Sequence, residues 1–169
     1  MQLSTIAVRV ARIRQEAIDI RSFELVSTDG SVLPGFSAGS HLDVETPGGI
    51  TRQYSLCNDP AEGHRYLIGV LQDPNTRGGS RSTHEQIQEG DVLRISTPKN
   101  HFALAHGAKH SLLPAGGIGV TPILCMAERL SITDAEFQMQ YCAREPERMA
   151  FHSRILGSKF ASRVKMHFH

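Results

Sequence analysis

The run RQYS, residues 52–55, places an arginine, a tyrosine and a serine within four positions. An arginine can hold a phosphate through two parallel hydrogen bonds, and it keeps its charge across the physiological pH range. A tyrosine ring and a serine hydroxyl beside it can contact a flat ligand and the polar edge of that ligand. The alternative is structural: Tyr54 packs inside a sheet and Arg52 lies on the surface, where arginine is usually found.

A glycine-rich segment farther along the chain, AGGIGVTP at residues 115–122, offers a second place for an anion. The pattern predicts an apolar strand that runs into glycines, followed by a helix with Thr121 as its N-cap and Pro122 in its first position. Glycines let a bound group approach the backbone, and the start of a helix favours negative charge. The segment lacks the G-x-G-x-x-G spacing of a dinucleotide fingerprint, so a turn that serves only tight packing is an equal alternative.

A third place is the segment NTRGGSRSTHEQ, residues 75–86, in which Gly78, Gly79 and Ser80 precede a predicted helix. Backbone amides at the start of that helix, together with the Ser80 hydroxyl, can bind a phosphate. The alternative is a hairpin loop with an ordinary helix cap, because serine is common at that position for capping alone.

The cysteines and histidines form no metal-binding pattern, and we expect no metal site. The three cysteines are widely spaced, which excludes a full disulfide framework and a C-x-x-C knuckle, so we expect buried free thiols. His106 and His110 have a ligand spacing for a helix, but Gly107 disfavours a helix there, and no carboxylate or cysteine lies close by in the sequence. The cysteines are Cys57, Cys125 and Cys142.

The elements that position these residues fall into two groups, and the first group consists of strands. With the RQYS run they make about six strands joined by turn sequences such as TDGS and TPGG, which predicts a small antiparallel barrel or sandwich. A helix is expected near residues 82–90, with Gly90 at its end. Gly69 lies inside a dense apolar run and suggests a bulge or a close approach by a backbone or ligand. The other predicted strands are residues 6–13, 21–26, 41–46, 66–71 and 91–97.

The second group alternates strands and helices. An apolar strand at 111–116 is followed by a helix at 121–130, a strand at 136–143, a helix at 145–156 and a strand at 163–169. This order predicts a βαβαβ unit, half of an open parallel α/β sheet. We place the boundary near residue 105, which gives a barrel domain at 1–105 and a partial α/β domain at 106–169.

Composition narrows the class of protein. The chain has 169 residues with a formal net charge of +1, so charge alone gives no attraction to nucleic acid or to an acidic membrane. Its apolar runs fall short of the ~20 residues that span a bilayer. The first residues alternate apolar and polar side chains and lack the layout of a signal peptide, and we expect a cytoplasmic protein.

Four motifs occur in the same order in one known family. They are RQYSLCN, RGGS, GDVLRISTPKNHFAL and AGGIGVTPIL. Together they resemble the ferredoxin-NADP reductase superfamily, in particular its oxygenase-reductase branch, over the whole chain. The resemblance implies a flavin-binding barrel followed by an NAD(P)H-binding α/β domain. It also implies an oxidoreductase that takes hydride from NADH or NADPH onto a flavin, FMN in preference to FAD, and passes single electrons onward.

The family's site residues carry over onto matching positions of this chain. Arg52 would neutralise the flavin phosphate, and Gly79 and Ser80 would donate hydrogen bonds to it. Ser55, near the reactive flavin nitrogen N5, and Thr121, where nicotinamide meets flavin, would be the catalytic contacts. The cofactor-binding residues implied are Arg52, Tyr54, Ser55, Gly78, Gly79, Ser80, Gly116, Gly117, Gly119, Thr121, Pro122, Ala143 and Arg144.

The chain also departs from the family pattern. The further strands of the nucleotide domain, its CGP-type motif and the plant-type [2Fe–2S] domain have no counterpart here, and three cysteines cannot supply that cluster. We therefore expect a truncated reductase component of a Rieske-type oxygenase or demethylase system, with an oxygenase as electron acceptor of the full-length protein. A flavin-binding module without turnover and a stand-alone flavin reductase are the alternatives. The strand at Leu112 would leave an open sheet edge, so we expect the chain to dimerise, swap or aggregate through that edge, or to depend on docking against the barrel. Pro114 removes one backbone donor from that strand.

Overall fold

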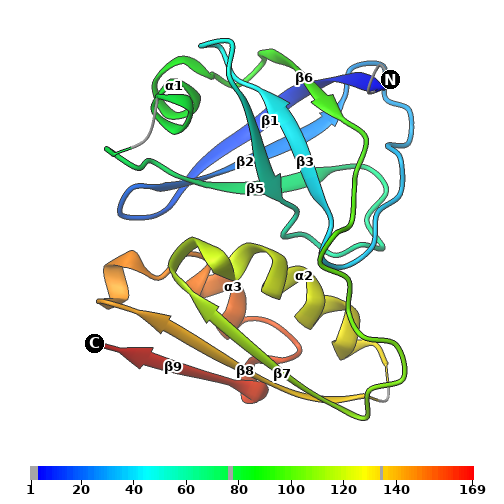
Figure 1. The fold of residues 1–169 in the computed structure, drawn as a ribbon, viewed down its shortest axis with the longest axis vertical. Helices are drawn as coiled ribbons and strands as arrows, with labels where there is room; N and C mark the ends of the chain where they lie inside the picture. The colour runs from blue at the N-terminus through cyan, green and yellow to red at the C-terminus, as the bar shows by residue number, and fades with distance from the viewer. Residues whose placement is uncertain (1–3, 76–77, 134) are drawn as a thin grey trace.

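The computed structural model describes residues 4–75, 78–133 and 135–169. Within these ranges the chain forms a six-stranded antiparallel sheet and a three-stranded parallel sheet. Figure 1 shows the antiparallel strands as one curled layer above, and the parallel sheet below, with helices between the two. The predicted succession of an antiparallel unit and a βαβαβ unit is confirmed.

The antiparallel sheet has the strand order β4-β3-β6-β1-β2-β5. Val8, Val10, Leu42 and Val44 are fully buried at alternate positions, as a strand with one face toward a core requires. Leu56, just after β4, forms an isolated bridge with Ile68 in β5, so the two edge strands approach each other and close one end of the barrel. The strands are β1 (Thr5–Ala17), β2 (Ile20–Ser27), β3 (His41–Glu45), β4 (Thr51–Ser55), β5 (Tyr66–Leu71) and β6 (Val92–Ser96).

The barrel's helix α1 (Gly79–Gln86) begins three residues earlier than the sequence pattern indicates and ends four residues before Gly90. It ends because Ile87 is extended and buried in the barrel core. Gly90 instead adopts a positive φ of 94° in the turn before β6, a conformation that favours glycine.

The α/β unit contains β7 (His110–Gly116), α2 (Val120–Ser131), β8 (Glu136–Ala143), α3 (His152–Leu156) and β9 (Val164–Phe168). Its strands pair in parallel in the order β7-β8-β9. Both helices lie on the side of the sheet that faces the barrel (Figure 1). Because β7 stands first in the strand order, it is an edge strand in the described part of the chain, and Leu112 on it is 65% exposed.

Two details of this unit differ from the sequence-based expectation. Thr121 is not the N-cap of α2: a short 3₁₀ turn, Gly117–Gly119, precedes the helix, and the Thr121 hydroxyl donates to the Ile118 carbonyl at 3.1 Å. The helix expected at 145–156 is broken into a 3₁₀ turn at Pro146–Arg148 and the short α3. Burial explains the break, because the intervening residues enter the core and Phe151 takes a positive φ of 62° to do so.

The α/β unit and one side of the barrel share a buried cluster. Ile20, Ala38 and Cys57 from the barrel belong to the same buried cluster as the side chains of α2 and α3. The turn between β1 and β2 adds a backbone hydrogen bond, from the Ile18 N–H to the Glu147 carbonyl at 2.9 Å. The α/β unit thus buries its helices against the barrel, and its roughly 60 residues do not have to form an independent core.

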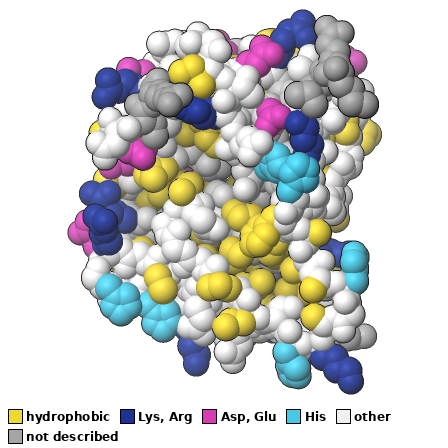
Figure 2. Space-filling model, viewed as in Figure 1, with side chains coloured by type: hydrophobic (Ala, Val, Ile, Leu, Met, Phe, Trp, Pro, Cys, Tyr) yellow, Lys and Arg dark blue, Asp and Glu magenta, His cyan; other side chains and the backbone are white. Residues whose placement is uncertain are grey.

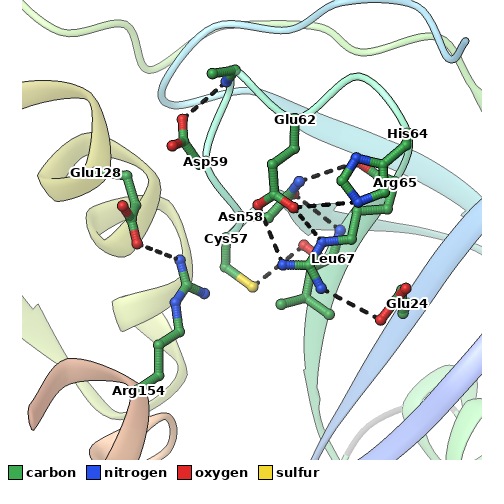
Figure 3. A network of polar contacts seen from close by, with 11 residues as sticks. Glu24, Cys57, Asn58, Asp59, Glu62, His64, Arg65, Leu67, Glu128 and Arg154 are labelled. Carbon is green, nitrogen blue, oxygen red and sulfur yellow. Dashed lines mark hydrogen bonds and ion pairs between the residues drawn. The ribbon is translucent and has the colours of Figure 1, made fainter. Parts of the chain in front are cut away.

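Polar groups surround one end of this interface (Figure 3). On the α/β side, Arg154 of α3 donates to Glu128 of α2 at 3.2 Å. On the barrel side, the Cys57 thiol donates to the Leu67 carbonyl at 3.3 Å. Arg65 lies beyond it and pairs with Glu62 at 2.6 Å. The charged groups on both sides therefore have partners close to the apolar contact.

Gly69 in β5 allows the closest approach across the interface. A Cβ atom built there would lie 2.9 Å from Thr121 Cγ2 and 3.4 Å from both Ile118 Cδ1 and Phe151 Cε2. Close approach by side chains of the α/β unit, and not a bulge, therefore accounts for this glycine.

Substitution Gly69→Ala should destabilise the chain by about 1–3 kcal/mol, because an added methyl group forces the packed interface apart. The free energy of unfolding in urea measures the effect. Gly35→Ala is the matched control, since a Cβ there meets no atom of the described residues within 4 Å. Equal stability of the two variants would contradict the account of the interface.

Candidate functional site

Arg52 lies across the amino-terminal end of α1. A Cβ atom on Gly79, the first residue of that helix, would be 2.6 Å from Arg52 Nε and 3.0 Å from its Cγ. The first turn of α1 contains no acidic residue, and the N-cap, Gly78, has a positive φ of 91°. A guanidinium and the positive end of a helix dipole therefore meet at one point, an arrangement that an anion would stabilise.

Arg52 is thus not a freely exposed surface residue, whereas Tyr54 fits both sequence-based alternatives. Tyr54 packs against the barrel's buried cluster, and burial raises the pKa of its hydroxyl. It also lines the same cavity as Arg52. Arg52 and Tyr54 alternate with Gln53 along β4, so the strand directs both toward the same face.

That cavity, the seam cavity, lies where the edge strands β4 and β5 meet the start of α2. Its volume is about 420 Å³, and it collects residues from all three predicted phosphate-binding segments. Ser80 accepts a hydrogen bond from the Asp73 N–H at 3.2 Å, and both residues line the wall. Its lining is Arg52, Gln53, Tyr54, Ser55, Gly69, Leu71, Asp73, Ser80, Ile118, Gly119, Thr121 and Pro122.

A larger hollow of about 690 Å³, the strand-end groove, adjoins the seam cavity. The two share Leu71, Asp73 and Ile118 in their walls. The groove lies at the carboxyl ends of β8 and β9, the usual ligand position in an open α/β sheet. In Figure 2 apolar side chains gather across the middle of the visible face, where the α/β layer meets the barrel.

The strand-end groove contains the predicted residues Gly117, Ala143 and Arg144. It also contains Arg148 and His169, which sequence reasoning did not select. Arg148 contacts Asp19 of the β1–β2 turn at 3.5 Å, so the barrel forms one rim of the groove. A bend after β8 brings Arg148 here, and periodicity alone does not reveal that bend.

Of the remaining predicted residues, Gly119 and Pro122 line the seam cavity, whereas Gly116 is in the lining of neither space. Gly116 ends β7, and Gly119 precedes α2, with Pro122 inside its first turn, where the missing N–H of proline costs no helical hydrogen bond. Thr76 and Arg77, before Gly78, lie outside the described residues.

The cysteines differ in exposure, which corrects the expectation that all three are buried. Cys57 and Cys125 are fully buried, and burial raises the pKa of Cys57 to about 11 and that of Cys125 to about 12. Cys142 is exposed and lines the strand-end groove. All three are free thiols in the described chain.

The histidine pair HGAKH, at 106–110, is not helical, and His110 pairs instead with Glu136 at 3.0 Å. Over residues 4–75, 78–133 and 135–169, three or more His, Cys, Asp or Glu side chains do not meet in a metal-binding group. None of the helices in these ranges is long and apolar enough to cross a membrane.

Comparison with known proteins finds relatives that are reductase components of oxygenase systems. A scan of protein-family models finds no match. The chain is 62% identical over 162 residues to a vanillate O-demethylase oxidoreductase of Pseudomonas putida, which covers 96% of this chain and 50% of that protein. It is 44% identical over 160 residues to the phthalate dioxygenase reductase of Burkholderia cepacia, with 94% of this chain and 50% of the relative covered.

A solved structure agrees with these relatives. Phthalate dioxygenase reductase, described as a modular structure for electron transfer from pyridine nucleotides to [2Fe–2S], superposes with a TM-score of 0.93 at 42% identity. The superposition covers 98% of this chain and 52% of that structure. The chain spans about half the length of the curated relatives it matches. By sequence and fold, the chain belongs to the ferredoxin-NADP reductase superfamily, in the branch that includes phthalate dioxygenase reductase and vanillate O-demethylase oxidoreductase.

Proposed function

We propose that the chain is the flavin- and pyridine-nucleotide-binding part of an oxygenase reductase. The observation that carries this proposal is the position of Arg52 over Gly79 at the start of α1, beside the seam cavity. Two positive groups converge there without an acidic residue in the first turn of the helix. A phosphate fits that place, because it would accept hydrogen bonds from the guanidinium and from the α1 amides.

The seam cavity then holds the flavin. Arg52, Gly78, Gly79 and Ser80 surround the phosphate, and Tyr54 contributes its ring. When bound, a flavin accepts hydride from a nicotinamide and releases electrons one at a time. FMN is favoured over FAD because the RQYS and RGGS motifs resemble those of the FMN-binding branch of the superfamily.

The strand-end groove is proposed to hold the nicotinamide nucleotide. Gly117 lines the groove and lets the backbone approach the nucleotide, with Gly116 and Gly119 close to it in the chain, and Arg144 and Arg148 supply positive charge near the rim. Thr121 and Pro122 line the seam cavity with Ser55, and Ile118, which lines both spaces, lies three residues before Thr121. Side chains here would position the nicotinamide and flavin rings and exclude water. We prefer NADH over NADPH only because of the resemblance to the oxygenase-reductase branch.

We extend the proposal to the domain division and the partners. The antiparallel sheet ends at Ser96 and the parallel sheet begins at His110, which supports a division near residue 105. In the whole protein an oxygenase component would accept the electrons after a [2Fe–2S] centre, and three free thiols suit the cytoplasm. Copies of the chain would pair through the β7 edge; a monomer at every concentration in light scattering would contradict that pairing.

A second candidate is a flavin-binding module without turnover, because the described nucleotide-binding sheet has only three strands. Reduction of ferricyanide by NADH in the presence of FMN separates the two. The reductase proposal predicts sustained turnover at micromolar NADH. Binding of FMN without turnover would favour the module.

Replacement of Arg52 by Met should weaken FMN binding by about 10- to 100-fold, because hydrogen bonds to a charged group contribute roughly 1.5–3 kcal/mol. Quenching of flavin fluorescence measures the dissociation constant. Arg9→Met, on the exposed face of β1, is the matched control and should bind FMN like the unaltered chain. An R52M variant that binds FMN normally would contradict the phosphate assignment.

Alkylation of Cys142 should slow in the presence of NADH, because the nucleotide would cover the groove that this thiol lines. Iodoacetamide labelling followed by peptide mass spectrometry reports each cysteine separately. Cys57 and Cys125 should stay unlabelled below pH 9 in the folded chain, since their raised pKa values and burial leave little thiolate. A labelling rate of Cys142 that is unchanged by saturating NADH would place the nucleotide elsewhere.

A further inference from the structure

A second polar hollow, the histidine hollow, lies on the other side of β4 from Arg52. Its volume is about 310 Å³, and its wall contains His41, Gln53, Ser55 and His101. Gln53 and Ser55 line this hollow and the seam cavity alike. The two spaces therefore meet at these two side chains of a single strand.

His41 and Ser55 are direct cross-strand partners. They face each other in the antiparallel pairing of β3 with β4, and their Cβ atoms are therefore about 4.5–5.5 Å apart. Ser55 is thus the residue through which a group at His41 reaches the contents of the seam cavity.

The imidazole of His41 is held in a defined place by its neighbours. Its backbone pairs with Lys99 in both directions, at 2.8 and 3.0 Å, and its ring meets the ring of His101 edge to face at 5.4 Å between centroids. Its Nε2 atom is buried and lacks a hydrogen-bond partner among the described residues. A buried ring nitrogen of this kind calls for a partner, and the hollow beside it is polar and large enough for water.

The charged groups around His41 come from every element packed against it. Asp43 lies two residues along β3 and accepts from Lys99 Nζ at 2.6 Å, so its charge is largely balanced. His101 and Lys99 come from the segment after β6, while β4 contributes the neutral Gln53 and Ser55. Burial is the main cause that lowers the pKa of His41, opposed by Asp43, so the imidazole is mostly neutral at pH 7.

We propose that His41 is a positioning residue that acts through Ser55: its protonation decides whether the Ser55 hydroxyl offers a hydrogen-bond donor or an acceptor to the flavin ring in the seam cavity. A neutral imidazole accepts a hydrogen bond, relayed by water in the histidine hollow, from the Ser55 hydroxyl, which leaves only oxygen lone pairs facing the ring. A protonated imidazole donates, which frees the Ser55 proton for a ring nitrogen that accepts. The inference rests on the proposed flavin site, and it makes the affinity of that site for flavin depend on pH.

The sign of the effect follows from this arrangement. Oxidised flavin presents acceptor nitrogens at its edge, so it should bind more tightly when His41 is protonated. Binding must then raise the pKa of His41, because a ligand that prefers one protonation state stabilises that state. One neutral hydrogen bond corresponds to about a three- to tenfold change in the dissociation constant.

The test measures FMN dissociation constants between pH 5 and pH 8 for the unaltered chain and for His41→Gln, which keeps a donor and an acceptor without titrating. Taking the ratio of the two dissociation constants at each pH cancels the effect that ionisation of the FMN phosphate has on both. We expect this ratio to change by about three- to tenfold across the range, with the unaltered chain gaining affinity at low pH. His64→Gln is the matched control, since the His64 side chain is 72% exposed, and its ratio should stay constant.

A constant ratio for His41→Gln, including a uniform loss of affinity at every pH, would overturn the inference and leave the flavin site intact. Failure of the unaltered chain to bind FMN at any pH would overturn the proposed function together with this inference. If His41→Gln does not fold, NMR titration of His41 in the unaltered chain gives the same answer with riboflavin, which has no phosphate. A rise in the His41 pKa on riboflavin binding is expected, and an unchanged value overturns the inference.

Discussion

The arrangement of this molecule centres on the meeting of Arg52 with the amino end of α1. Two positive groups at one point are unfavourable by themselves, and the fold still brings them together, with Gly79 present where a larger residue would push the guanidinium away. An anion relieves that repulsion. We therefore interpret three features as one phosphate-binding position: the barrel strand β4, the glycines at the start of α1, and the seam cavity beside them.

The second requirement is that the α/β unit docks at a fixed place on the barrel. Gly69 in β5 permits the start of α2 to approach closely, and the buried cluster that crosses the interface fixes that approach. The same contact makes the strand-end groove adjoin the seam cavity, so that two ligands bound there would meet. The packing that stabilises the half-sheet thus also sets the distance between the two proposed cofactors.

Much of the fold was predictable from the sequence, because apolar and polar residues alternate along the strands and turn motifs lie at the strand ends. The order of elements follows from those patterns, whereas the grouping of Arg52, Tyr54 and Ser55 with the glycine segments came from the family resemblance. The break at Phe151 was not predictable, since burial of the preceding residues overrides a continuous helical pattern. The positions of His41 and Arg148 beside the two cavities were missed for a similar reason: cross-strand register and a bend in the backbone place them, and neither appears in local spacing.

The central claim is that the seam cavity holds a flavin with a single phosphate. The most direct measurement offers FMN and FAD together to the purified chain, removes unbound flavin, and identifies what the protein releases on denaturation. The account predicts a yellow protein that releases an equimolar amount of FMN. A colourless protein would contradict the flavin site, and release of FAD would contradict the assignment of one phosphate to Arg52 and α1.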